Sequence, residues 1–156
     1  MAANDREIER KYLLRALPER VASAQSVEVD QGYLPGVRIN ERIRRMRSPD
    51  TTRFFRTIKN GSGLERFELE EETTEEFFNT VWPLTRGARI FKRRYFVPEE
   101  NVVWEIDEFL DRPGLWLAEV ELESVDQRVK IPKWLEPVVE REVTEEREYT
   151  NRALAR

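Results

Sequence analysis

Charged side chains recur at every second position near the start of the chain. Glu7, Glu9 and Lys11 occupy alternate positions, with Ile8 and Tyr12 among the residues beside them. Alternate side chains of a β-strand point to one face, whereas a soluble antiparallel sheet usually encloses an apolar face. The same alternation returns at Glu68 and Glu70, at Lys92 and Arg94, and at Glu119 and Glu121. We therefore expect several strands that share one strongly charged face.

The carboxylates on this face have the chemistry of a site for a hard divalent cation. Glu7 and Glu9 on one strand would meet Glu119 and Glu121 on another, and Mg²⁺ typically takes one or two carboxylates together with water and phosphate oxygens. Glu119 and Glu121 alternate with apolar residues over 117–122, which is unusual for a surface strand. The alternative interpretation is a solvated strand face that binds nothing.

Six basic residues on the same face have the chemistry to bind phosphate. They are Lys11, Arg42, Arg44, Lys59, Lys92 and Arg94. Arginine recognises phosphate oxygens in a planar, bidentate way, and lysine acts as a point charge. Six such cations lining a tunnel would match a polyphosphate, and Glu68 and Glu70 would orient them when no substrate is bound.

Two arginine pairs compete for the inward face of one strand. Arg42 and Arg44 lie on the face opposite to Arg45 and Arg47 in a regular strand, so only one pair can point inward. Choosing Arg42 and Arg44 places Ile43 outward, where the other strands also carry apolar residues. This first choice is preferred, although a β-bulge would alter it.

Strands are the main elements that must position these residues. Eight candidates cover 6–14, 26–34, 38–47, 52–60, 64–72, 88–97, 102–110 and 115–124. Short turn signals between most of them, such as Pro35-Gly36, predict antiparallel hairpins. A helix is expected near 74–82 behind a Thr73 or Thr74 cap, with further short helices near 17–25 and 145–155.

Eight antiparallel strands in a small protein can close into a barrel, which removes the exposed strand edges. A dry interior filled with charges would be very unstable. We therefore predict a mainly β fold, a closed eight-stranded antiparallel β-barrel with a wet, charged interior and an apolar outer face partly covered by helices. The length of 156 residues suits a single domain over 1–156.

The chain contains neither cysteine nor histidine. This composition excludes disulfides, thiolate nucleophiles, imidazole bases and histidine-ligated zinc. A metal site must then use oxygen ligands, which favours Mg²⁺ or Mn²⁺ as the cofactor. The net charge of −4 is unlike that of a nucleic-acid-binding protein, and no apolar run approaches a membrane span. We expect a cytoplasmic protein without nucleic-acid or membrane partners.

Short motifs also follow one another in a fixed order along the chain. They are Glu7-x-Glu9-x-Lys11, Gln31-Gly32-Tyr33-Leu34, Arg42-Ile43-Arg44, Thr57-Ile58-Lys59, Arg66-x-Glu68-x-Glu70, Lys92-x-Arg94-Tyr95, Glu105-Ile106-Asp107, Glu119-Val120-Glu121 and Tyr149-x-Asn151-x-x-Leu154. Their order and spacing resemble the CYTH superfamily, also called the triphosphate tunnel metalloenzymes, and the last motif is similar to the tail of its small bacterial members. The resemblance runs nearly from end to end of the chain.

The resemblance implies an eight-stranded tunnel that binds a triphosphate and a divalent metal ion. By matching position, Glu7, Glu9, Glu119 and Glu121 would hold the metal, and Lys11, Arg42, Arg44, Lys59, Lys92 and Arg94 would hold the phosphates. Asp107 would join Glu68 and Glu70 as an acid that orients the cations.

The predicted activity is that of a metal-dependent triphosphatase acting on inorganic tripolyphosphate or a small organic triphosphate. Phosphoryl transfer depends mostly on positioning and charge stabilisation, so Glu7, Glu9, Lys11 and Glu121 are the candidate catalytic residues. Two alternatives stay open: an adenylyl cyclase of the class IV type, and a non-catalytic module that binds polyphosphate or triphosphate. Monomer and homodimer are both compatible with the sequence.

Overall fold

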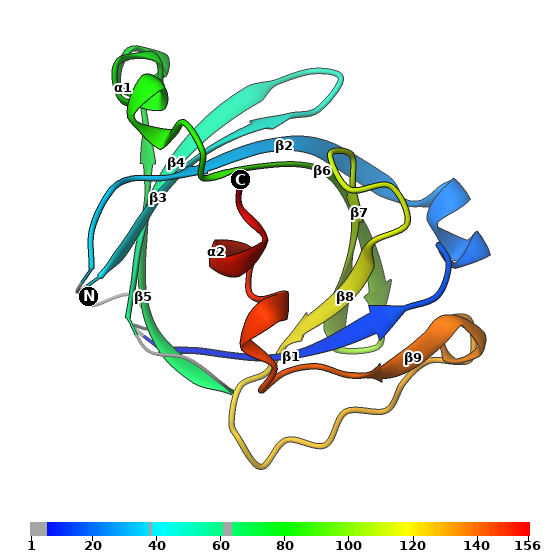
Figure 1. Cartoon of the computed structure of the whole chain (residues 1–156). Coiled ribbons are helices and arrows are strands. Elements are labelled where there is room, and N and C mark those ends of the chain that lie inside the picture. The colour runs from blue at the N-terminus through cyan, green and yellow to red at the C-terminus, as the bar shows by residue number, and fades with distance from the viewer. Residues whose placement is uncertain (1–5, 38, 61–63) are drawn as a thin grey trace.

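Nine strands form one antiparallel sheet that closes on itself in the computed structural model, which describes residues 6–37, 39–60 and 64–156 (Figure 1). The strands are β1 (Arg6–Leu14), β2 (Gln25–Tyr33), β3 (Asn40–Arg47), β4 (Thr52–Asn60), β5 (Glu65–Thr73), β6 (Arg89–Glu99), β7 (Val102–Phe109), β8 (Trp116–Glu121) and β9 (Val139–Glu142). Their order is β5-β4-β3-β2-β6-β7-β8-β1-β9, and an additional pairing of β5 with β1 closes eight of them into a barrel. The predicted fold class is confirmed.

The eight predicted strands agree with β1 to β8 to within a few residues at each end. The prediction began β3 at residue 38, which lies outside the described residues, and the strand starts at Asn40. No strand was predicted at β9, which has only four residues. It pairs with Tyr12, Leu13 and Leu14 at the end of β1, with a shift of register inside the pairing.

Helical segments are short and lie outside or across the barrel. They are η1 (Glu19–Ser23), α1 (Glu75–Val81), η2 (Trp82–Thr85), η3 (Glu136–Val138), η4 (Arg147–Tyr149) and α2 (Asn151–Leu154). The predicted cap of α1 is Thr74, whose side chain accepts a hydrogen bond from the Phe77 backbone N–H at 3.1 Å. Within the described part of the chain, no helix is both long and apolar enough to cross a membrane.

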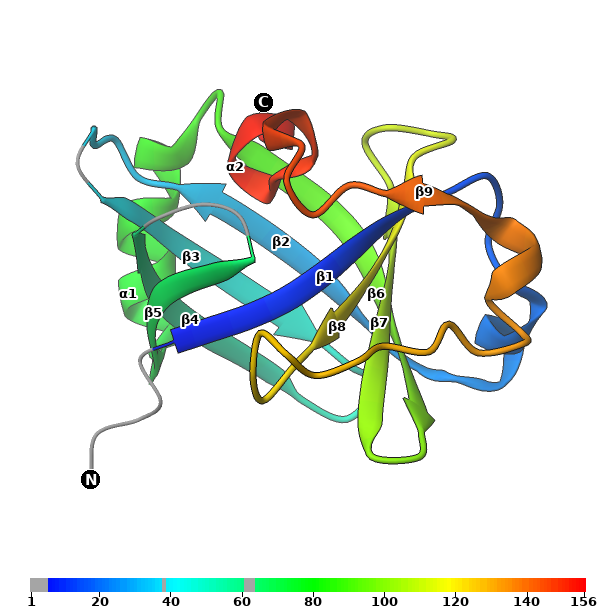
Figure 2. The same ribbon diagram turned by 90° about the horizontal axis from the view of Figure 1, so that it is seen from below.

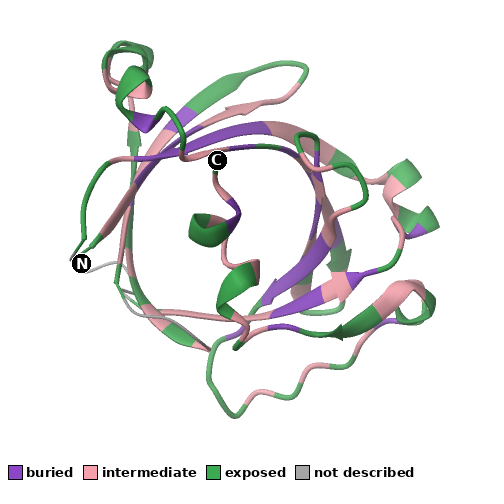
Figure 3. Ribbon diagram, viewed as in Figure 1, coloured by how far each residue is buried: buried purple, intermediate pink, exposed green. Residues whose placement is uncertain are grey.

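The largest apolar core packs on the outside of the barrel. Tyr12, Trp104, Ile106 and Val120 are buried together with Leu135 from the connector that follows β8. On another side, α1 covers the sheet by packing Phe78 against the outer face of β3 and β4. Figure 3 shows that buried residues follow the strands, whereas the segments outside the sheet are mostly exposed or half-buried. Apolar packing outside the sheet leaves the interior available for charges.

The C-terminal segment crosses one end of the barrel (Figure 2). Leu154 of α2 packs with Ile90, Phe109 and Leu117 in an apolar cluster. The last residue, Arg156, exchanges two backbone hydrogen bonds with Arg89, at 2.7 and 2.9 Å. Ile90 and Lys92 share the inward face of β6 because they are two positions apart. One end of the predicted charged interior is therefore apolar and closed by α2.

Candidate active site

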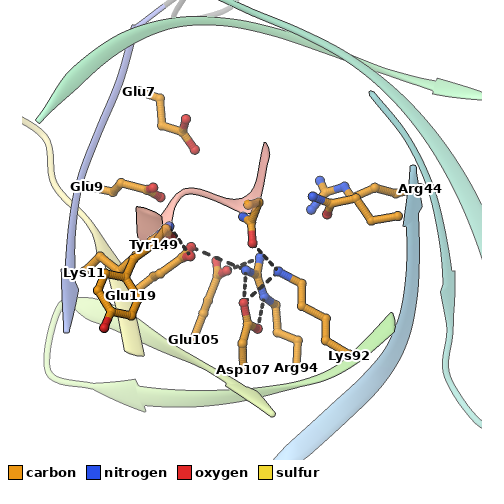
Figure 4. A network of polar contacts seen from close by, with 12 residues as sticks. Glu7, Glu9, Lys11, Arg44, Lys92, Arg94, Glu105, Asp107, Glu119 and Tyr149 are labelled. Atoms are coloured by element: carbon orange, nitrogen blue, oxygen red, sulfur yellow. Dashed lines mark hydrogen bonds and ion pairs between the residues drawn. The ribbon is translucent and has the colours of Figure 1, made fainter. Parts of the chain in front are cut away.

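A cavity of about 150 Å³ lies inside the barrel and is lined almost entirely by charged side chains. We call it the inner cavity. Its lining consists of Glu7, Glu9, Arg42, Arg44, Lys59, Glu68, Glu70, Arg94, Glu105, Glu119, Glu121 and Asn151. Seven strands contribute, because alternate residues of each strand point inward. Figure 4 shows several of these side chains pointing toward one another across the barrel. All but Glu105 and Asn151 were candidates from the sequence.

Arg42 and Arg44 are the arginine pair that faces the inner cavity. The Arg44 guanidinium lies 2.9 Å from Glu70. Arg45 and Arg47 contact Asp30 on the other face, where the Arg45 Nε donates to the carboxylate at 2.9 Å. The prediction that Arg42 and Arg44, and not Arg45 and Arg47, point inward agrees with this arrangement.

Three predicted residues lie just behind the cavity wall. The Lys92 ammonium is 2.7 Å from Asp107, and both side chains are fully buried. The Lys11 ammonium is 3.2 Å from Glu119 and donates to the Tyr149 carbonyl at 3.1 Å. Neither Lys11, Lys92 nor Asp107 lines the inner cavity.

Burial affects the pKa values of these inner groups in opposite ways. Burial and the nearby Arg94 lower the pKa of Lys92 to about 8. Burial alone would raise the pKa of Asp107, but Arg94 and Lys92 outweigh it, so that pKa is lowered. Burial would also raise the pKa of Glu119, yet Lys11 and Arg94 hold it well below the usual 4.5. Asp107 and Glu119 are therefore anions that position the surrounding cations.

The predicted orienting acids contact the cations of the inner cavity. Glu68 lies 3.1 Å from the Lys59 ammonium. Burial would raise the pKa of Glu70, but Arg44 and Arg42 outweigh it and lower that pKa. Asp107 accepts two hydrogen bonds from Arg94, at 2.7 and 2.8 Å. Each of these cations is held in place by a carboxylate in the absence of a ligand.

Carboxylates also face one another across the pairing of β1 with β8. Glu9 stands directly opposite Glu121, and like charges at such positions repel. Burial, followed by Glu119 and Glu7, raises the pKa of Glu9. Burial, followed by Glu7 and Glu68, raises the pKa of Glu121. On this side of the inner cavity the nearby cations, Lys11 and Arg66, do not outweigh the burial and mutual repulsion of the carboxylates.

The donor set fits a hard divalent cation, although the side chains are turned toward basic partners. Seven carboxylates and four cations line the inner cavity, and oxygen ligands of this kind suit Mg²⁺ or Mn²⁺. In the described ranges, no three acidic side chains converge closely enough to hold a metal ion. Glu7 is 2.9 Å from the Lys59 ammonium, and Glu9 contacts Arg66. A bound cation would replace these partners.

Sequence reasoning did not select three residues of this region. Arg66 contacts Glu9 and lies 3.2 Å from Glu7, and the alternation that selected Glu68 applies to it as well. Glu105 similarly shares the inward face of β7 with Asp107 and contacts Arg94. Asn151 lines the inner cavity from α2, and its place depends on tertiary packing that no strand alternation indicates.

A closed barrel with acidic and basic side chains around an internal cavity is the architecture of the CYTH class, the triphosphate tunnel proteins. No family model matches the chain. The inorganic triphosphatase of Nitrosomonas europaea is 36% identical to it, over 96% of each chain. The inorganic triphosphatase of Acetivibrio thermocellus is 29% identical, over 97% of this chain and 94% of its own. The crystal structure of the inorganic triphosphatase NE1496 is 33% identical, with a TM-score of 0.65, and covers 99% of this chain and 95% of its own. The chain belongs to the inorganic triphosphatase family.

Proposed function

We propose that this protein is a divalent-metal-dependent triphosphatase that hydrolyses inorganic tripolyphosphate. The inner cavity carries the proposal, because it combines four cations that can bind phosphate with seven carboxylates that can bind a metal ion. Relatives named inorganic triphosphatases support the choice of substrate. Catalysis of phosphoryl transfer consists mainly of positioning and electrostatic stabilisation, which a rigid barrel with inward charges can supply.

The phosphate chain would lie along the basic side chains of the inner cavity. Arg42, Arg44, Lys59 and Arg94 bind its oxygens, and Lys11 and Lys92 complete the set from behind the wall. Phosphate oxygens would replace carboxylate partners such as Glu70, which lies 2.9 Å from Arg44. Glu68, Glu70 and Asp107 keep the cations oriented before the substrate enters, so little rearrangement is needed.

Glu7, Glu9, Glu119 and Glu121 would hold the Mg²⁺ or Mn²⁺ ion. When bound, such a cation neutralises phosphate charge and lowers the pKa of a coordinated water. The raised pKa values of Glu9 and Glu121 suit these two residues for accepting a proton from the attacking water. Glu7 completes the candidate catalytic set as a ligand of the metal ion. Lys11 holds Glu119 in position at 3.2 Å.

Phosphate release from tripolyphosphate, ATP and thiamine triphosphate, measured side by side with Mg²⁺ and then Mn²⁺, tests the proposal. We expect orthophosphate from tripolyphosphate only when a divalent ion is present. Cyclic nucleotide and pyrophosphate from ATP would instead show an adenylyl cyclase. Tight binding of tripolyphosphate with Mg²⁺ and no phosphate release would show a binding module, and either result would overturn the proposal.

The proposal also covers the setting of the enzyme. We place it in the cytoplasm and treat 1–156 as a single catalytic domain. The relatives match nearly the whole chain, which supports one domain. It would act as a monomer or a homodimer on a small-molecule triphosphate. Light scattering after size-exclusion chromatography distinguishes the two oligomeric states.

A further inference from the structure

A second and larger cavity, of about 490 Å³, lies at the end of the barrel that α2 crosses. We call it the outer cavity. Its lining consists of Tyr33, Val37, Asn40, Arg42, Lys59, Asn60, Arg66, Arg147, Thr150, Asn151, Arg152 and Ala153. Arg42, Lys59 and Asn151 also line the inner cavity, so the two cavities adjoin. A chain-like ligand could therefore extend from one into the other.

The charge of the outer cavity differs from that of the inner one. Five basic side chains and no carboxylates line it among the described residues. Three of them are engaged inward: Arg42 lies 3.8 Å from Glu68, Lys59 lies 2.9 Å from Glu7, and Arg66 contacts Glu9. The remaining two, Arg147 and Arg152, add positive charge that no carboxylate among the described lining residues offsets, which favours an anionic ligand.

The two outermost cations come from the C-terminal segment. Arg147 in η4 and Arg152 in α2 are exposed. Neither lies within 4.0 Å of an acidic group over 6–37, 39–60 and 64–156. Their guanidinium groups can therefore bind phosphate oxygens without first breaking an ion pair, unlike Arg44 or Arg94 in the inner cavity.

The same lining disfavours a nucleoside as the occupant. A base would require a free aromatic or apolar face, but the guanidinium of Arg152 lies over the Tyr33 ring at 5.2 Å from its centre. Asn40, Asn60 and Thr150 add polar groups to the wall. The lining matches further phosphate units better than a flat heterocycle.

We propose that the outer cavity is a second anion subsite, which takes the phosphate units of a condensed phosphate chain beyond those held in the inner cavity. Arg147 and Arg152 are its binding residues and make the protein prefer inorganic chains of four or more phosphates. The inference rests on the proposed function, because it assumes that the inner cavity holds the first phosphates.

Calorimetric titration of the metal-free full-length protein with tripolyphosphate, tetrapolyphosphate and ATP tests this subsite. We expect tetrapolyphosphate to bind about tenfold more tightly than tripolyphosphate, as for one or two added charge-assisted contacts. The double variant R147Q/R152Q should lose that difference and keep its affinity for tripolyphosphate within about twofold. R147K/R152K should retain part of the affinity difference between the two phosphate chains. The control R128Q/K130Q makes the same charge change at exposed positions that line a separate groove, and it should retain the whole difference.

The outcomes separate this inference from the proposed function. Equal affinity for the two phosphate chains, or an equal loss in R128Q/K130Q, would overturn the outer subsite even if tripolyphosphate is hydrolysed. A loss of ATP affinity in R147Q/R152Q, with the phosphate-chain difference unchanged, would overturn it in favour of a nucleoside site. If tripolyphosphate is not hydrolysed but the binding difference depends on Arg147 and Arg152, the subsite stands and only the catalytic proposal fails.

Discussion

Glu9 shows how a single residue can be unfavourable for the free protein and necessary for its chemistry. Its carboxylate stands opposite Glu121, and burial together with Glu119 and Glu7 raises its pKa. We expect Glu9→Gln to lower kcat for tripolyphosphate by roughly 100-fold or more. The free energy of unfolding of the metal-free variant should not fall, because a neutral amide removes the repulsion.

Paired measurements of kcat and of urea unfolding check this prediction. Glu123→Gln, at an exposed position after β8, is the control and should change neither quantity. Full Mg²⁺-dependent activity in Glu9→Gln would contradict the assignment of this residue to the metal.

The lowered pKa of Lys92 predicts how substrate binding depends on pH. Its pKa is lowered to about 8, so the free protein loses this positive charge as the pH rises through that value. An anionic substrate binds the charged form better, and kcat/KM for tripolyphosphate should therefore fall above pH 8. In Lys92→Arg, whose guanidinium stays charged, the profile should be flat between pH 7 and 9.5. An unchanged decline in that variant would assign the titration to another group.

At the scale of elements, Gly32 permits β2 to pack closely against η2. A Cβ atom added at Gly32 would lie 2.6 Å from the Cβ of Thr85, and the Thr85 side chain is fully buried. Gly32→Ala should therefore lower the free energy of unfolding by about 1–3 kcal/mol. Gly36→Ala is the matched control, because among the described residues its Cβ would meet only the Ile39 carbonyl, at 3.4 Å. Equal stability of the two variants in urea denaturation would contradict the packing argument.

The elements that sequence reasoning located are those with a strong local signal. In β1, Glu7, Glu9 and Lys11 alternate without interruption, and the same period identified β5, β6 and β8. β9 has only four residues, Val139–Glu142, and lies just after Pro137. So short a segment has no strand pattern of its own, and it forms a strand because it pairs with β1. The position of α2 across the barrel likewise depends on the packing of Leu154 against Ile90, which no local pattern encodes.

At the scale of the molecule, the fold reverses the usual placement of apolar and charged groups. Trp104 and Ile106 are fully buried on the outer side of β7, while Asp107 on the inner side is equally buried. The arrangement followed from the sequence because charged residues alternate with apolar ones along several strands, such as Glu119 and Glu121 in β8. What could not be inferred was the apolar inner corner of Ile90, Phe109 and Leu117, since it forms only when the C-terminal segment packs against it.

Some buried carboxylates have raised pKa values and others have lowered ones, which gives the whole protein an unusual dependence of stability on pH. Glu9, Glu105 and Glu121 have raised pKa values, chiefly through burial. Such a group takes up its proton more readily in the folded than in the unfolded state, so its unfavourable contribution at neutral pH disappears as the pH falls toward 4.5. Glu119 and Asp107 have lowered pKa values, and their stabilising contribution is lost only at lower pH.

The metal-free protein should therefore become more stable between pH 7 and about 5, and less stable below about 4. Lys92 does not alter this window, because it is protonated in both states there. Mg²⁺ at about 100 times its dissociation constant should add about 2.7 kcal/mol near pH 7, and less at pH 5, where protonation of the carboxylates competes with the metal. Urea unfolding at pH 3–7, with and without Mg²⁺, measures both effects. A steady loss of stability from pH 7 downward in the metal-free protein would contradict this prediction. It would show that the basic side chains already neutralise the carboxylates of the inner cavity, so that repulsion among these carboxylates would no longer favour a bound metal ion.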